Sequence, residues 1–145
     1  MILCDVNVLV YAFREDLEQH PTYHAWLEET INNDEPFGIS NLVASRFVRV
    51  VTNRKIFVEP SRLEPAFQFL RDLRSAPAAV PVREGPRIWR IFEDLCRKVG
   101  AKGNLVPDAH LAALAIESGC TLVSADRGFA RFPGLRWRHP LDVGR

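Results

Sequence analysis

Three aspartates of this 145-residue sequence stand where carboxylates can carry out chemistry. Asp5 directly follows the apolar residues 2–4, and Asp126 follows a second apolar run, residues 121–124. Asp108 lies in the first turn of an expected helix. Carboxylates gathered in one pocket repel one another by about 4 kcal/mol per pair at ~4 Å and an effective dielectric of ~20. Such a cluster is tolerable when it binds a hard divalent cation such as Mg²⁺.

A cluster of this kind predicts metal-dependent hydrolysis of phosphodiester bonds. A bound cation lowers the pKa of a coordinated water, orients it for in-line attack and neutralises charge on the phosphate. Two of the aspartates also have a structural explanation, because Asp108 favours a helix N-terminus and Asp126 is a common turn residue. Asp5 is harder to explain structurally, because an acid among apolar residues is costly unless it is paired or binds a metal.

The elements that must position these acids alternate between strand-like and helix-like segments, which predicts an α/β fold with a parallel sheet. Parallel strands end at the same edge of a sheet, so Asp5 and Asp126 are expected at one edge. The helix before residue 121 runs back along the sheet, and its N-terminus can bring Asp108 to that edge. Expected strands cover residues 2–4, 36–40, 79–82 and 121–124, with a last one around Leu135 and Trp137.

Local signals predict where several helices begin and end. Pro107 is expected to open the helix of Asp108, and Gly100 and Gly119 are expected to end helices. Ser61-Arg62-Leu63-Glu64 has the pattern of a capping box, so a helix is expected to start there. Its inward face is expected to consist of Leu63, Ala66, Phe67, Leu70 and Leu73. Pro81 favours an edge position for its strand.

Composition predicts one globular domain over residues 1–145, with 47% hydrophobic and 26% charged residues. No apolar run approaches the roughly 20 residues that span a membrane, and the N-terminus lacks the pattern of a signal peptide. We therefore expect a cytoplasmic protein. Cys4, Cys96 and Cys120 form no Cys-x-x-Cys pair and are expected to be reduced.

The net charge of +1 hides an asymmetry along the chain. Residues 1–36 carry eight acidic residues and one basic residue, whereas residues 37–145 carry ten acidic and eighteen basic ones. Most of these basic residues are arginines, whose guanidinium groups bind phosphate oxygens bidentately. This asymmetry favours a nucleic-acid partner only slightly over a mixed, solvated surface.

Three segments follow one another in an order typical of a known family. Residues 2–12 form an apolar run around Asp5, residues 103–115 place Asp108 before a helix of small residues, and residues 121–129 carry Asp126. With these segments the sequence resembles PIN-domain nucleases, and in particular the VapC-type toxins of bacterial toxin–antitoxin pairs. The similarity extends from Met1 to about Pro140.

The resemblance implies a three-layer α/β/α sandwich with a central, mainly parallel sheet. It also implies an endoribonuclease that cleaves RNA, such as tRNA or ribosomal RNA, by metal-activated water with Mg²⁺ or Mn²⁺. The partners that it implies are a second copy in a homodimer and a cognate VapB-type antitoxin. By the same resemblance Asp5 and Asp108 are direct metal ligands, and Asp126 is a third catalytic acid that holds metal through water or holds a second ion. Neither the RNA target nor the identity of the antitoxin follows from the sequence.

The sequence departs from the family pattern at one place in the helix after the second strand. Arg46 stands where the family usually carries a glutamate, which leaves three acids and puts a second bound metal in doubt. One hypothesis is that Arg46 or Arg49 contacts the RNA phosphate instead; the alternative is that Arg46 is a surface residue.

Further candidates for positioning substrate or water are Asn7, Asn104 and Ser124. Turn or cap roles explain the asparagines equally well, and Ser124 is expected to line the pocket. Two other functions stay open. One is a catalytically weakened PIN-like module that binds RNA or a partner, for which the missing glutamate is the only support. The other is an aspartate-based phosphatase, which uses a nucleophilic aspartate with a second acid two residues on. Asn7 occupies that second position and counts against it.

Overall fold

The sheet of this protein is formed by five parallel strands in the order β3-β2-β1-β4-β5. The structure is a computed structural model that describes residues 1–142, so the end of the expected 1–145 domain lies outside the described residues. Pro81 lies in an edge strand, as its missing N–H predicted. The strands are β1 (Ile2–Cys4), β2 (Phe37–Ser40), β3 (Ala79–Val82), β4 (Thr121–Val123) and β5 (Trp137–Arg138).

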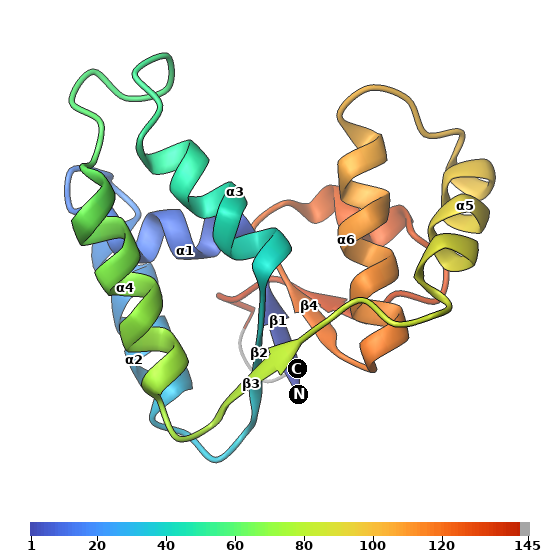
Figure 1. Ribbon diagram of the computed structural model, residues 1–145, viewed down its shortest axis with the longest axis horizontal. Helices are drawn as coiled ribbons and strands as arrows, with labels where there is room; N and C mark the ends of the chain where they lie inside the picture. Colours follow the sequence, from blue (N-terminus) through green and yellow to red (C-terminus); the bar gives the residue numbers. More distant parts are fainter. Residues whose placement is uncertain (143–145) are drawn as a thin grey trace.

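Helices cover both faces of the sheet, and the predicted three-layer α/β/α arrangement is confirmed (Figure 1). One side carries α1 (Val6–Phe13), α2 (His20–Ile31), α3 (Asn41–Val51) and α4 (Leu63–Ser75). The other side carries α5 (Ile88–Val99) and α6 (Leu105–Ser118). A short 3₁₀ helix, η1 (Arg127–Arg131), follows β4.

The core is centred on β1 and β4, the strands that precede Asp5 and Asp126. Ile2, Leu3, Leu122 and Val123 are completely buried, because helices cover both faces of a parallel sheet. The small residues of α6 belong to the same core, and Ala109, Ala112, Ala113 and Ala115 have no exposed surface. The strands that precede Asp5 and Asp126 are therefore fixed in the buried core.

The start of α4 differs from the prediction, because Ser61 does not cap it. The helix begins at Leu63, and its N-cap residue Arg62 makes no side-chain capping bond. The Ser61 hydroxyl instead accepts a 2.9 Å hydrogen bond from Nη1 of Arg14, 47 positions earlier. The Ser61 hydroxyl thus bonds to a distant arginine instead of to the backbone at the start of α4.

The expected inward face of α4 was partly wrong. Ala66, Leu70 and Leu73 are buried, but 57% of Leu63 and 43% of Phe67 remain exposed. Helix α6 also begins earlier than expected, at Leu105 rather than at Pro107. Gly100 and Gly119 end α5 and α6 in the left-handed conformation, as predicted.

Within residues 1–142, no helix combines the length and the apolar character that a membrane crossing requires. The three cysteines are free, as expected. Burial raises the pKa of the Cys4 thiol to about 12, and the neighbouring Asp5 carboxylate adds to this effect. Cys4 therefore stays protonated and is a poor nucleophile.

Candidate active site

The register between β1 and β4 determines which side chains meet at the edge of the sheet. Cys4 pairs with Val123, and the amide of Asp5 donates a 2.8 Å hydrogen bond to the Val123 carbonyl. The next residues, Asp5 and Ser124, therefore lie side by side at the carboxyl ends of the two strands. Asp126 follows two residues later as the N-cap of η1, where its Oδ1 accepts a 2.8 Å hydrogen bond from the Gly128 amide.

Ser124 links three candidate residues through one hydroxyl group. It donates a 2.7 Å hydrogen bond to Oδ2 of Asp5 and accepts hydrogen bonds from the Asp126 amide at 3.0 Å and from Nδ2 of Asn7 at 3.3 Å. These bonds use the one donor and both acceptor positions of a hydroxyl. Ser124 is completely buried, so the expectation that it lines the pocket was wrong. It lies beneath the pocket and orients the residues above it.

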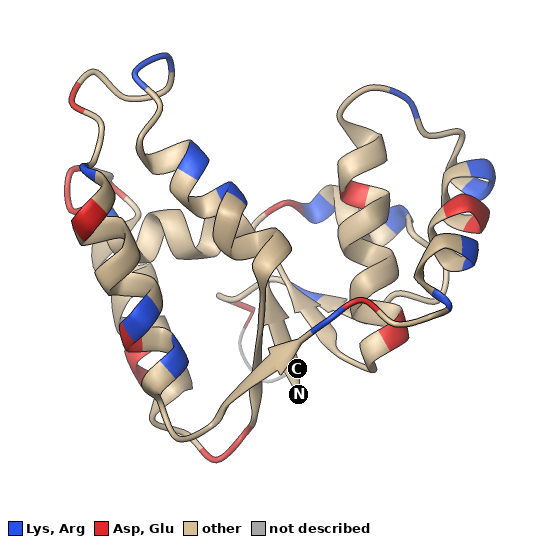
Figure 2. Cartoon of the chain, viewed as in Figure 1, with Lys and Arg blue, Asp and Glu red and all other residues tan. Residues whose placement is uncertain are grey.

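A cleft of ≈ 680 Å³ opens above this edge of the sheet, with residues of α1 and α3 on one side and the start of α6 on the other. Figure 2 shows basic residues on α3 and an acidic residue near the start of α6. Of the seven predicted site residues, Ser124 does not line this cleft. The six that do are Asp5, Asn7, Arg46, Asn104, Asp108 and Asp126.

The three aspartates share the cleft but do not form a closed metal cage. Across residues 1–142, no three acidic, histidine or cysteine side chains come close enough together to hold a metal ion. The close clustering of the three carboxylates, expected from the sequence, is therefore absent from this arrangement. Mg²⁺ is commonly held by only one or two carboxylates together with water and substrate phosphate. An open donor set of this kind fits such an ion.

The Asp5 carboxyl is partly buried and is held by hydrogen bonds from Ser124 and from the Val6 amide. Burial raises the pKa of its carboxyl, and the charge of Asp126 raises it further. The hydrogen bonds from Ser124 and from the Val6 amide, the latter 2.7 Å long, act in the opposite direction, as does the charge of Arg46. A carboxylate that is partly desolvated and near another acid gains from a cation in the cleft.

Asp108 is in a similar electrostatic position at the start of α6. Burial raises the pKa of its carboxyl, and the charges of Asp5 and Asp126 add to this effect. Arg46 and Arg131 lower it. Because these charges act on Asp108 from three other segments of the chain, the structure unites acids that are more than 100 positions apart in the sequence.

Arg46 reaches the cleft from α3, which starts directly at the end of β2. The Ser40 hydroxyl accepts a 3.1 Å hydrogen bond from the Val43 amide and so caps the helix. Arg46 lies about one turn further on and is half-buried. Within residues 1–142 it forms no ion pair with an acid at 4.0 Å or less. Its guanidinium is thus available to a ligand in the cleft.

Asn7 has a structural role at the edge of the sheet. Besides its bond to Ser124, its Oδ1 accepts a 3.3 Å hydrogen bond from the Ala125 amide. Asn104, by contrast, is exposed at the mouth of the cleft and makes no side-chain capping bond to α6. Of the two asparagines, Asn104 is the one whose amide is free to meet a substrate.

Sequence reasoning missed Arg14, a buried arginine beside the cleft. It is only 8% exposed, and its guanidinium lies 4.0 Å from the centroid of the Phe57 ring, which lines the cleft. The available signal was its position as the only basic residue among the first 36, directly after an apolar helix. A lone charge in such a place needs partners, and here they come from the segment between α3 and α4.

Comparisons with known proteins agree on one family. The sequence profile of the PIN domain matches residues 2–135. The chain is 53% identical over 142 residues to the ribonuclease VapC43 of Mycobacterium tuberculosis, covering 98% of this chain and 97% of that protein. It is 42% identical over 140 residues to the ribonuclease VapC25 of the same species, covering 97% and 99% of the two chains.

The fold also resembles solved structures. One of them is VapBC2 from Rickettsia felis, bound to a DNA fragment from its promoter. The match has a TM-score of 0.68 and 22% identity, and it covers 96% of this chain and 98% of that one. At this identity the likeness supports the fold alone.

Proposed function

This chain belongs to the PIN-domain family and groups with its VapC ribonucleases, and from that premise we propose that it is a Mg²⁺-dependent endoribonuclease, the toxin of a VapBC-type pair. The observation that carries the proposal is the single cleft lined by Asp5, Asp108 and Asp126, with Arg46 beside them. Acids for a cation and a guanidinium for a phosphate are the groups that phosphodiester hydrolysis needs.

In this proposal Asp5 and Asp108 hold the metal directly. The pKa of each carboxyl is raised by burial and by a neighbouring acid, so a bound cation relieves a repulsion that already exists in the fold. When bound, Mg²⁺ lowers the pKa of a coordinated water and neutralises charge on the phosphate. Mn²⁺, which takes the same oxygen ligands, is an alternative ion.

The other residues of the cleft have supporting roles. Asp126 is exposed and holds metal through water or accepts a proton near it. Arg46 binds a non-bridging oxygen of the phosphate in the place of a fourth acid. Asn104, at the mouth, donates to the substrate, whereas Ser124 and Asn7 keep the Asp5 carboxylate in position.

The partners of the chain follow from its relatives. We propose that it binds a VapB-type antitoxin, as the name VapBC of the solved complex implies for that protein. We also propose a homodimer acting on tRNA or ribosomal RNA, and such RNA places the protein in the cytoplasm. Purification with the product of the adjacent gene, followed by mass measurement of the complex, tests both assemblies.

The direct test is cleavage of defined RNAs by the purified protein with Mg²⁺ or with EDTA. We expect products with 5′-phosphate and 3′-hydroxyl ends in Mg²⁺ only, and none from Asp5→Asn or Asp108→Asn. Ser45→Ala, a change at an exposed position of α3, is the matched control and should cleave normally. Cleavage that persists in EDTA contradicts the proposed mechanism.

A second candidate function is supported by Arg46 itself. An arginine beside two acids can weaken cation binding and leave a module that binds RNA or a partner without cutting it. Expression in cells distinguishes the two functions: growth arrest by the wild type that is relieved by Asp5→Asn, at equal protein levels, favours catalysis. Arrest by both proteins favours the binding module.

A further inference from the structure

Residues 52–61, which make up most of the segment between α3 and α4, form a closed loop that we call the arm. Its two ends meet where the Ser61 amide donates a 2.7 Å hydrogen bond to the Val51 carbonyl. Inside the arm the Asn53 carbonyl accepts hydrogen bonds from the amides of Ile56 and Phe57, both at 3.0 Å. The Asn53 side chain accepts a third, 2.9 Å long, from the Lys55 amide. The arm therefore has a definite internal fold, as in other compact surface loops with adjoining ends.

Arg14 attaches the arm to the rest of the protein. Its Nη1 donates to the Glu59 carbonyl at 2.8 Å and to the Ser61 hydroxyl at 2.9 Å, and its guanidinium packs on the Phe57 ring. The other edge of the guanidinium is held by Asp16, at 2.9 and 2.6 Å. Burying a charge in this way is costly unless all its donors are used. Here four hydrogen bonds from the guanidinium offset its desolvation, and two of them hold the arm in place.

The arm forms part of the wall of the cleft that contains the aspartates. Ile56 and Phe57 line this cleft, together with Arg46 and Arg49 of α3. Arg54 and Lys55 occupy the exposed tip of the arm and form no ion pair within residues 1–142. In Figure 2 the basic residues of α3 and those at the tip of the loop follow one another outward.

We propose that the arm is a preformed binding site for single-stranded RNA next to the catalytic cleft. Arg54 and Lys55 bind phosphates of the strand on one side of the bond to be cut, and Ile56 offers an apolar contact to a base. Arg14 is a positioning residue, because it holds the arm without touching the RNA. Since the arm is ordered beforehand, RNA binding does not carry the cost of ordering it. This inference rests on the proposed function.

Charge favours RNA over a protein as the occupant of the arm. The unpaired cations at its tip continue the basic residues of α3 away from the acids, and spaced cations of this kind follow a phosphate chain. Two large apolar side chains of the arm are exposed, Ile56 at 55% and Val58 at 100%, and Ile56 also lines the cleft. Two side chains are few for a stable protein interface, which takes about 20–30 residues from each partner. A protein partner of the arm is nevertheless a distinct outcome that the experiment below can reveal.

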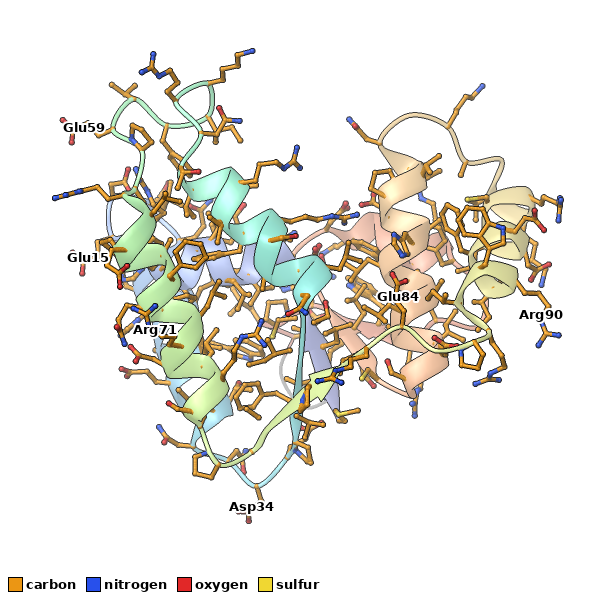
Figure 3. The ribbon with its side chains drawn as sticks, in the orientation of Figure 1. Glu15, Asp34, Glu59, Arg71, Glu84 and Arg90 are labelled. Carbon is orange, nitrogen blue, oxygen red and sulfur yellow. The ribbon has the colours of Figure 1, made fainter. Side chains whose placement is uncertain are left out.

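The first test measures binding of a single-stranded RNA in EDTA, where cleavage is blocked, for the wild type and for Arg54→Ala/Lys55→Ala. Loss of two phosphate contacts should weaken binding on the order of tenfold at about 0.1 M salt and lower the salt-dependence slope by about 1.4. The matched control is Arg71→Ala/Arg74→Ala on α4, which removes two exposed arginines that do not line the cleft. Figure 3 labels Arg71 on the outer surface of this helix. An equal loss in the control, or an unchanged slope in the arm variant, overturns the proposal.

The second test asks whether Arg14 acts through the arm. Arg14→Met should weaken RNA binding in the wild-type arm and have a clearly smaller effect in the Arg54→Ala/Lys55→Ala background, where only the Ile56 contact is left to lose. Additive losses mean that Arg14 has only a general structural role. If Arg14→Met does not fold, as judged by circular dichroism, Ser61→Ala removes one contact of the same clamp and is measured in the same cycle.

Failure of this inference can be told apart from failure of the proposed function. If the wild type cleaves RNA in Mg²⁺ but the arm variant binds and cleaves normally, the inference is wrong and the ribonuclease stands. If the wild type neither binds nor cleaves RNA, both are wrong. If the arm variant keeps its RNA affinity but loses the co-expressed antitoxin, the arm binds protein and the RNA proposal is overturned.

Discussion

The Ser124 hydroxyl donates a 2.7 Å hydrogen bond to Oδ2 of Asp5, 119 positions earlier in the chain. This bond joins the carboxyl ends of β1 and β4 and holds the carboxylate at the floor of the cleft. The same hydroxyl oxygen of Ser124 accepts hydrogen bonds from the backbone amide of Asp126 and from the side-chain amide of Asn7. One buried hydroxyl thus connects the parts of the site that come from the two central strands.

Replacing Ser124 by alanine should damage both the site and the fold. Two partly buried donors, the Asp126 amide and Nδ2 of Asn7, lose their acceptor, which costs up to about 1–3 kcal/mol of unfolding free energy. Loss of a residue that orients a ligand typically reduces metal affinity or activity about 10- to 100-fold. Because the hydroxyl bond lowers the pKa of Asp5, the acid limb of the pH–rate profile should move to higher pH. Ser124→Thr, which keeps the hydroxyl, should restore that limb; an unshifted limb in Ser124→Ala contradicts the assigned role.

Removing the charge of Asp108 should stabilise the metal-free protein near neutral pH. The pKa of this carboxyl is raised in the folded state, so its charged form opposes folding above the folded pKa. As the pH falls through the folded pKa to below the ordinary value of 3.8, the wild type recovers this stability. We therefore expect urea unfolding in EDTA to show Asp108→Asn as more stable at pH 7, with the difference vanishing in acid. Equal stability at pH 7 would speak against repulsion in the cleft.

Magnesium should stabilise the wild type in proportion to its occupancy. At a free concentration 100 times the Kd, a ligand that binds only the folded state adds about 2.7 kcal/mol. Thermal unfolding of the wild type should therefore shift upward with added Mg²⁺, while Asp5→Asn and Asp108→Asn should respond much less. Asp94→Asn, a change on the exposed surface of α5, is the control and should respond like the wild type. A shift of the same size in all four proteins indicates unspecific binding.

Reversing the charge of Arg46 tests whether it binds the substrate phosphate. A hydrogen bond to a charged group contributes about 1.5–3 kcal/mol, so Arg46→Glu should reduce RNA affinity or cleavage roughly 10- to 100-fold. Arg90→Glu on α5, whose side chain points away from α6 (Figure 3), is the matched control. Unchanged RNA affinity and cleavage in Arg46→Glu would show that Arg46 does not bind the substrate phosphate. A gain in Mg²⁺ affinity without loss of RNA binding would assign it to the metal site alone.

The fold class and the common edge of the acids were predictable because they depend on regular features. Parallel strands have their carboxyl ends at one edge, so Asp5 and Asp126 had to lie at the same edge once both strands were recognised. Their closeness depends on the pairing of β1 with β4, which was not predicted from the sequence. The helix before β4 had to return along the sheet, which brings Asp108 to the same edge. These arguments need only the order and the direction of the elements.

What could not be predicted depends on contacts between distant residues. Ser61 has the local pattern of a helix cap, but a guanidinium 47 positions away binds its hydroxyl. Ser124 was expected to face the pocket, whereas the pairing of Cys4 with Val123 directs it beneath Asp5. Periodicity likewise placed Phe67 inward, yet α4 buries only its narrower face of Ala66, Leu70 and Leu73.

The central place of β1 in the sheet has a consequence for how the protein is made. Ile2–Cys4 leaves the ribosome before both of its neighbours in the sheet, β2 and β4, and β4 begins only at Thr121. A nascent chain therefore keeps one side of β1 unpaired, and Asp5 without its partner, until most of the polypeptide has been translated. An incomplete translation product that ends before β4 lacks the assembled cleft, and on the proposed function it cannot cleave RNA.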